Sequence, residues 1–143
     1  MRPAAVLVLA LLAGPLASAA DREEGRRPVL KLRATPGVSF APANVLLIAE
    51  LVGGDTVEEF YCPEVVWDFD DGRRSTSQSE CEPFGGDSSL ERRFLVRQSY
   101  AHPGEYRPTI TLRRADGVVA RAAVTVLVPS SSASGGAFAA SNR

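Results

Sequence analysis

Apolar and polar residues alternate with a period of two along most of the chain, and Pro and Gly residues interrupt the alternation. A period of two is typical of β-strands that bury one face, and no stretch after the N-terminal region keeps the period of an amphipathic helix. The pattern predicts strands at residues 29–33, 44–52, 65–69, 91–98, 106–113 and 118–128. Six or seven short strands separated by turns favour an all-β fold, a two-sheet β-sandwich of about seven strands.

The alternation also predicts which side chains face the core. In the third strand Val65, Trp67 and Phe69 share one face, and in the last strand we expect the inner face to be formed by Val118, Ala120, Ala122, Val124 and Val126. Residues 45–52 are apolar on both faces, which favours a central strand, because an exposed apolar edge promotes aggregation. The alternative is an edge strand that accepts a strand from a partner.

The N-terminal residues have the layout of a secretory signal peptide. A short basic start precedes the apolar run 4–13, and small residues follow at 17–19. The run is shorter than the ~20 residues that span a bilayer, which disfavours an uncleaved anchor, and no later apolar segment reaches that length. We therefore expect a signal peptide at 1–19 and a secreted or periplasmic protein, with a charged leader at 20–28, the domain at 29–128 and a flexible Ser- and Gly-rich tail at 129–143.

The two cysteines, Cys62 and Cys81, are an even pair in an exported chain, which favours a disulfide. The bond would close a loop of about twenty residues, worth roughly 3 kcal/mol in the chain-entropy model. Two free thiols are the alternative. A structural zinc site is disfavoured because two thiols and the single His102 supply too few ligands.

Charge is distributed unevenly although the formal net charge is only −1. Residues 55–91 carry eleven Asp or Glu against two Arg, a net of −9, whereas residues 92–121 carry seven Arg against two acids, a net of +5. The two halves can pair internally, or one of them can face a charged partner.

Two motifs resemble the signatures of PKD (polycystic kidney disease) domains. The segment Trp67-Asp68-Phe69-Asp70-Asp71-Gly72 resembles the WDFGDG signature, with Asp70 where the family has Gly, and residues 100–106 resemble a second signature of Tyr, Pro-Gly and Tyr. The resemblance covers about residues 29–128 and implies an Ig-like sandwich, non-catalytic in most members, that serves as an extracellular binding or spacer module. A longer stretch at 73–99 and the absence of accompanying repeats depart from the family and argue against a simple spacer.

The signature residues have expected structural roles. Trp67 and Phe69 would anchor the core between the sheets, and Gly72 would supply the positive φ of a tight turn. We expect the hydroxyl of Tyr100 to fix the corner before the next strand, where Gly104 and Tyr106 complete the second signature.

The acidic turn allows two interpretations. Asp68, Asp70 and Asp71, with Glu64, could hold a calcium ion, but Gly72 falls at the fifth position rather than the sixth, so the EF-hand template fails. An exposed acidic turn is the simpler interpretation. The prediction is therefore no cofactor, with calcium left open.

Catalytic motifs are not evident. Residues 86–90 place Ser88 and Ser89 after a glycine but do not match G-x-S-x-G, and the single histidine, His102, lies in a Pro-Gly turn. A solvated loop histidine explains His102 better than a triad does. We therefore predict a protein that is not an enzyme, with a hydrolase as the least favoured alternative.

Arginines provide the candidate binding surface. Arg107, Arg113 and Arg121 should lie on the outer face of neighbouring strands, and Arg93 and Arg97 are expected to extend that surface. They form either ordinary solvated strand faces or a site for an anion or acidic partner. Nucleic acid is disfavoured because no aromatics are interleaved with the arginines. The predicted function is a secreted module that binds protein or glycan, and the alternative is a structural cell-surface component stiffened by calcium.

Overall fold

The computed structural model describes residues 26–115 and 117–131, and within them the chain forms an all-β fold with one short 3-10 helix. The strands are β1 (Val29–Thr35), β2 (Ala43–Val52), β3 (Glu64–Asp68), β4 (Arg74–Ser77), β5 (Arg93–Tyr100), β6 (Gly104–Tyr106), β7 (Thr109–Arg114), β8 (Gly117–Ala123) and β9 (Val126–Val128), with the helix η1 at Glu58–Phe60. The predicted fold class is confirmed. The predicted signal peptide, most of the leader and most of the tail lie outside the described residues.

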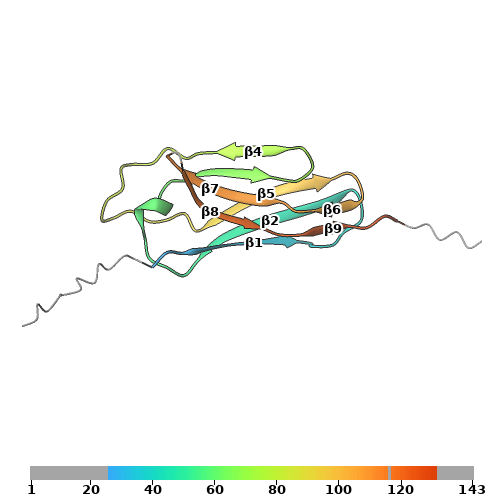
Figure 1. The fold of residues 1–143 in the computed structure, drawn as a ribbon, viewed down its shortest axis with the longest axis horizontal. Coiled ribbons are helices and arrows are strands. Elements are labelled where there is room, and N and C mark those ends of the chain that lie inside the picture. The colour runs from blue at the N-terminus through green and yellow to red at the C-terminus, as the bar shows by residue number, and fades with distance from the viewer. Residues whose placement is uncertain (1–25, 116, 132–143) are drawn as a thin grey trace, which may run out of the picture.

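The strands form an Ig-like sandwich of two antiparallel sheets (Figure 1). One sheet has the order β1-β2-β5, the other has the order β4-β3-β7-β8, and β6 pairs with β9 at one end. Inward side chains from both sheets fill the space between them, as alternation requires. Leu47, Trp67 and Ile110 are buried there, and Phe69 is 5% exposed, so the predicted core positions of Trp67 and Phe69 are confirmed.

β2 is the central strand of its sheet, as its two apolar faces predict, because β1 and β5 pair with its two edges. Ile48 lies on the outer face yet is only 6% exposed. Its cross-strand neighbours Arg33 and Leu95 cover it from both sides.

The last two predicted strands are each divided. Tyr106 belongs to β6 and not to β7, because Pro108 between them has no N–H for a ladder. The ladder between β7 and β8 shifts register after Leu112, which leaves Val119 as an extra residue. Such a bulge reverses the inward and outward alternation, so Val118 is 62% exposed and its predicted inner position is wrong.

Residues 73–99 are not one long insertion, because they contain β4 and most of β5. The irregular part is the loop 78–92, which is held on the body of the domain at several points. The Tyr61 hydroxyl donates a hydrogen bond to the Glu82 carbonyl at 2.9 Å, and the rings of Tyr61 and Phe84 pack edge to face with their centroids 5.2 Å apart. Leu90, at 9% exposed, anchors the end of the loop.

The predicted disulfide between Cys62 and Cys81 is present, with the two Cα atoms 6.2 Å apart. Cys62 precedes β3 and Cys81 follows β4, so the bond closes the open end of the β3–β4 hairpin. Every residue of β4 is exposed, so this edge strand buries little apolar surface of its own. The covalent link therefore holds a strand that packing alone retains weakly.

Candidate functional site

The three acidic side chains of the β3–β4 turn have separate structural partners. Asp68 accepts a hydrogen bond from the Asp70 N–H at 3.0 Å and pairs with Arg74 at 2.8 Å. Asp70, at a φ of +60°, accepts the Arg107 N–H at 2.8 Å. Among the described residues no group of three or more acidic, histidine or cysteine side chains could hold a metal ion. The structure thus does not gather Asp68, Asp70 and Asp71 as calcium ligands.

The third carboxylate, Asp71, links the two sheets. It accepts hydrogen bonds from the backbone N–H of Arg73 at 3.0 Å, from the Arg73 guanidinium at 2.6 Å and from the Gln98 amide at 2.7 Å. Burial raises the pKa of Asp71, but the hydrogen bonds from Arg73 and Gln98 outweigh it, so the pKa lies below its ordinary value. Gln98 is 7% exposed and comes from β5, so this contact fixes the turn of one sheet on the other.

Two stacked tyrosines hold the same end of the domain, with ring centroids 4.3 Å apart. The Tyr100 hydroxyl donates to the Phe69 carbonyl at 3.1 Å, whereas the Tyr106 hydroxyl donates to the His102 carbonyl at 2.8 Å. Tyr106 therefore fixes the Pro-Gly corner, and the prediction that Tyr100 does so is wrong. Tyr100 instead joins the end of β5 to the turn after β3. Burial raises the pKa of Tyr100, and the nearby Asp71 and Asp70 raise it further.

We expect Tyr100→Phe to lower the free energy of unfolding by about 1 kcal/mol, because the buried Phe69 carbonyl loses its donor. The raised pKa means that the native state keeps the Tyr100 proton, so its contribution is complete below the unfolded pKa of about 10 and is lost as pH rises above it. Urea denaturation at neutral and alkaline pH measures both effects. Tyr61→Phe, which removes an exposed hydrogen bond, is the matched control. An unchanged stability of Tyr100→Phe together with an unchanged alkaline decline would contradict this role.

The serine and the histidine of the least favoured alternative, a hydrolase, lie apart. Ser88 closes a tight turn, where its hydroxyl accepts the Gly85 N–H at 2.9 Å. His102 is exposed and follows β5, whereas Ser88 precedes it. Eight strand residues span about 25 Å, so the structure does not pair Ser88 with His102.

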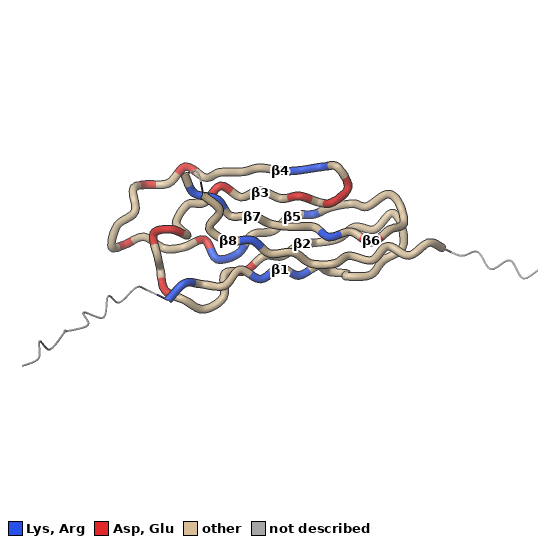
Figure 2. Tube along the Cα trace, in the orientation of Figure 1, with Lys and Arg blue, Asp and Glu red and all other residues tan. Residues whose placement is uncertain are grey.

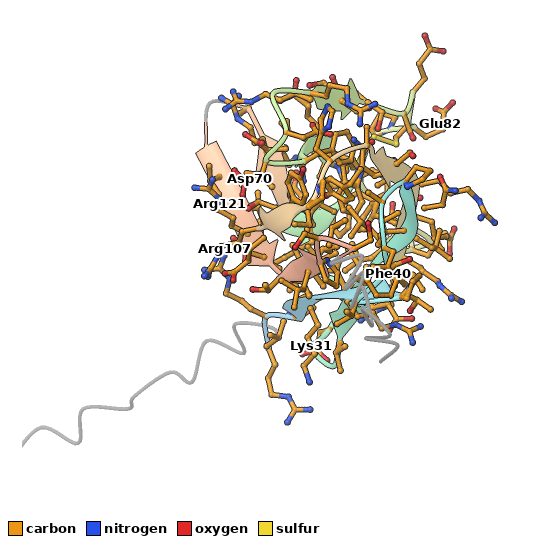
Figure 3. All side chains as sticks on the ribbon, turned by 90° about the vertical axis from the view of Figure 1, so that its right-hand side faces the viewer. Lys31, Phe40, Asp70, Glu82, Arg107 and Arg121 are labelled. Atoms are coloured by element: carbon orange, nitrogen blue, oxygen red, sulfur yellow. A yellow bond between two sulfur atoms is a disulfide. The ribbon has the colours of Figure 1, made fainter. Side chains whose placement is uncertain are left out.

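The five predicted arginines do not form one surface. Arg93 and Arg97 lie on the outer face of the β1-β2-β5 sheet, whereas Arg113 and Arg121 lie on the other sheet, because β5 pairs with β2 and not with β7. Figure 3 shows Arg107 and Arg121 projecting from one flank of the domain, while Lys31 points elsewhere. The expectation that Arg93 and Arg97 extend the surface of the other three is therefore wrong.

Charges on the β4-β3-β7-β8 sheet are largely balanced. Glu64 pairs with Arg113 at 3.8 Å, and Asp68 pairs with Arg74 at 2.8 Å on the same face. Figure 2 shows the acidic residues near the β3–β4 turn close to basic ones. Ordinary solvated ion pairs account for most of the charge on this sheet.

The outer face of the β1-β2-β5 sheet carries a larger net charge than the outer face of the other sheet. The ladder aligns Lys31, Glu50 and Arg93 in one row, Arg33, Ile48 and Leu95 in the next, and Thr35, Leu46 and Arg97 in a third. These rows contain four cationic side chains and one carboxylate, which gives a net charge of +3. We call this surface the basic face. Figure 2 shows its basic residues along β1.

Glu50 does not neutralise the basic face. It lies 3.9 Å from Arg33 and 3.7 Å from Arg93, so one carboxylate is shared between two guanidinium groups. Within the described residues no acidic side chain lies within ion-pair distance of Lys31 or Arg97. The face therefore keeps cations that are available to a ligand.

Apolar side chains form the centre of the basic face. Leu95 is 52% exposed, Leu46 is half-buried, and Val29 and Val52 are exposed at one end. Sequence reasoning found Arg93 and Arg97 but missed Lys31 and Arg33, although both alternate with leucines in the first strand. The alternation of apolar and polar residues does not show which strands pair, and it is this pairing that places β1 and β5 on either side of β2.

Comparisons with known proteins do not identify a family for this chain. No protein-family model and no curated protein match the sequence. Among solved structures, the CARDB domain of a Pyrococcus furiosus protein in complex with di-metal ions is similar, at 14% sequence identity and a TM-score of 0.44. The match covers 73% of this chain and 90% of that one. The described residues contain no helix long and apolar enough to cross a membrane.

Proposed function

We propose that this protein is an exported, non-catalytic binding module that holds an acidic protein partner on its basic face. The observation that carries the proposal is the net charge of +3 arranged around exposed Leu95 and half-buried Leu46. An apolar centre rimmed by charged side chains is the usual anatomy of a protein–protein interface, and arginine is enriched in such interfaces. The cations favour a partner of opposite charge and speed its association.

A protein partner fits this face better than a glycan does. The three strands place no aromatic side chain on the outer face, and aromatic rings are the surfaces on which sugar rings stack. A second copy of the chain is also disfavoured, because two basic faces would oppose like charges.

Export is supported by the signal-like residues 1–19 and by the disulfide, since disulfides persist in oxidising compartments. We further propose that the domain is a divergent PKD domain. Asp70 stands where that family has Gly and adopts a φ of +60°, a conformation that Gly favours and Asp tolerates. Gly72, with a φ of +86°, supplies the expected turn residue.

Binding to poly-L-glutamate tests the proposed face, with alginate as an acidic polysaccharide for comparison. We expect poly-L-glutamate to bind at low salt, and the double variant Arg93→Ser/Arg97→Ser to weaken binding about tenfold. The matched control, Arg113→Ser/Arg121→Ser, removes two charges from the other sheet and should bind nearly as well as the wild type. Equal losses in both variants would overturn the assignment to the basic face. Tighter binding of alginate would replace the protein partner with a glycan.

A further inference from the structure

One edge of β5 is unpaired within the part of the chain that the structure describes. There β5 pairs only with β2, and the Leu51 N–H donates to the Arg92 carbonyl at 2.8 Å. In an antiparallel pair the backbone groups of alternate residues point to the partner strand, so those of residues 93, 95 and 97 point away from β2. The backbone groups of Ser99 also point away from β2, and its carbonyl accepts a hydrogen bond from the Arg73 side chain at 2.6 Å, outside the sheet.

A cavity opens beside this edge, with a volume of about 290 Å³. Its lining combines Val65 and Trp67 of β3, Ser77 of β4 and Phe94 of β5. The opening exists because β4 and β5, the edge strands of the two sheets, do not pair, whereas β1 and β8 lie close on the opposite flank (Figure 1). The lining also includes Ser79 and Glu91, so a side chain that enters between β4 and β5 would contact polar groups as well as the apolar side chains of β3 and β5.

We propose that the β5 edge takes up an extended acidic segment of the partner as an added antiparallel strand. The proposal rests on the proposed function and specifies how the partner is held. In the added strand, the residues opposite Arg93, Leu95 and Arg97 would point to the basic face, and the residues between them would point to the cavity. The edge therefore selects a segment with two acidic residues four positions apart and apolar residues between them.

The same arrangement disfavours a second copy of this chain at the edge. Two β5 edges paired antiparallel about Leu95 would place Arg93 of each copy opposite Arg97 of the other. Like charges directly opposite each other destabilise a strand pair. The arginines at this edge thus disfavour self-association and favour an acidic strand.

Peptides with single backbone N-methyl groups test the added strand. The unmodified probe is the synthetic peptide Ser-Glu-Val-Leu-Val-Glu-Ser, whose central leucine would lie opposite Leu95. We expect a methyl group on the leucine nitrogen, which would face β5, to weaken binding about tenfold or more. The matched control carries the methyl group on the neighbouring valine nitrogen, which would face solvent, and should bind like the unmodified peptide.

A charge exchange provides the second readout. The variant Arg93→Glu/Arg97→Glu should no longer bind the glutamate peptide. It should instead bind the peptide in which lysine replaces both glutamates. Equal affinity of the unmodified and both methylated peptides would overturn strand addition while leaving the basic face as a binding surface. Failure of all glutamate peptides to bind would also overturn strand addition. The proposed function is tested separately, because it fails if poly-L-glutamate binding does not require Arg93 and Arg97 or if alginate binds more tightly.

Discussion

Replacing Cys62 and Cys81 with serine is expected to lower the free energy of unfolding by about 3 kcal/mol, the largest loss among the variants considered. The bond spans 19 positions of sequence and closes the β3–β4 hairpin at the end opposite its turn. Because all four residues of β4 are exposed, little packing opposes its separation from β3 once the bond is gone.

The single tryptophan reports this change directly, because Trp67 lies on β3 beside β4 and is only 4% exposed. Urea denaturation followed by Trp67 fluorescence measures the stability, and a red shift of the native emission would report loosening of β4. Ser79→Ala, in the same loop, is the control and should change stability little. A double serine variant as stable as the wild type would show that packing alone retains β4.

Asp71→Ala is expected to cost about 2 kcal/mol, because the buried Gln98 amide loses its acceptor and the turn loses its contact with β5. The effect depends on pH. The pKa of Asp71 is lowered in the folded state, so its contribution is complete above the unfolded pKa of about 3.9 and is lost as pH falls through the folded pKa.

Stability curves between neutral and strongly acidic pH test this role of Asp71. The wild type should lose stability more steeply than Asp71→Ala on the acid side, and the two should converge at low pH. Asp87→Ala, which changes an exposed carboxylate of the loop, is the control. Parallel curves for the wild type and Asp71→Ala would contradict a folded-state pKa below the ordinary value.

Features that depend on local alternation could be predicted from the sequence. The central position of β2, the burial of Trp67 and Phe69 and the disulfide all follow from residue type and spacing. Val118 could not be placed correctly, because one extra residue in β8 reverses the alternation and carries no sequence signal of its own.

The candidate site depended on pairing between distant strands. Arg93 and Arg97 were visible as exposed positions, but their neighbours Lys31 and Arg33 are more than fifty residues earlier in the chain. Only the order β1-β2-β5 brings the four cations onto one face and separates them from Arg113 and Arg121. Strand order is a long-range property that hydrophobic periodicity does not encode.

The most direct test of binding at the basic face is a titration of the isotopically labelled protein with the peptide Ser-Glu-Val-Leu-Val-Glu-Ser, followed by amide chemical shifts and hydrogen exchange. The amides of Arg93, Leu95 and Arg97 should shift most and become protected from exchange. Shifts that concentrate on β7 and β8, or that spread evenly over the domain, would contradict binding at this face and edge.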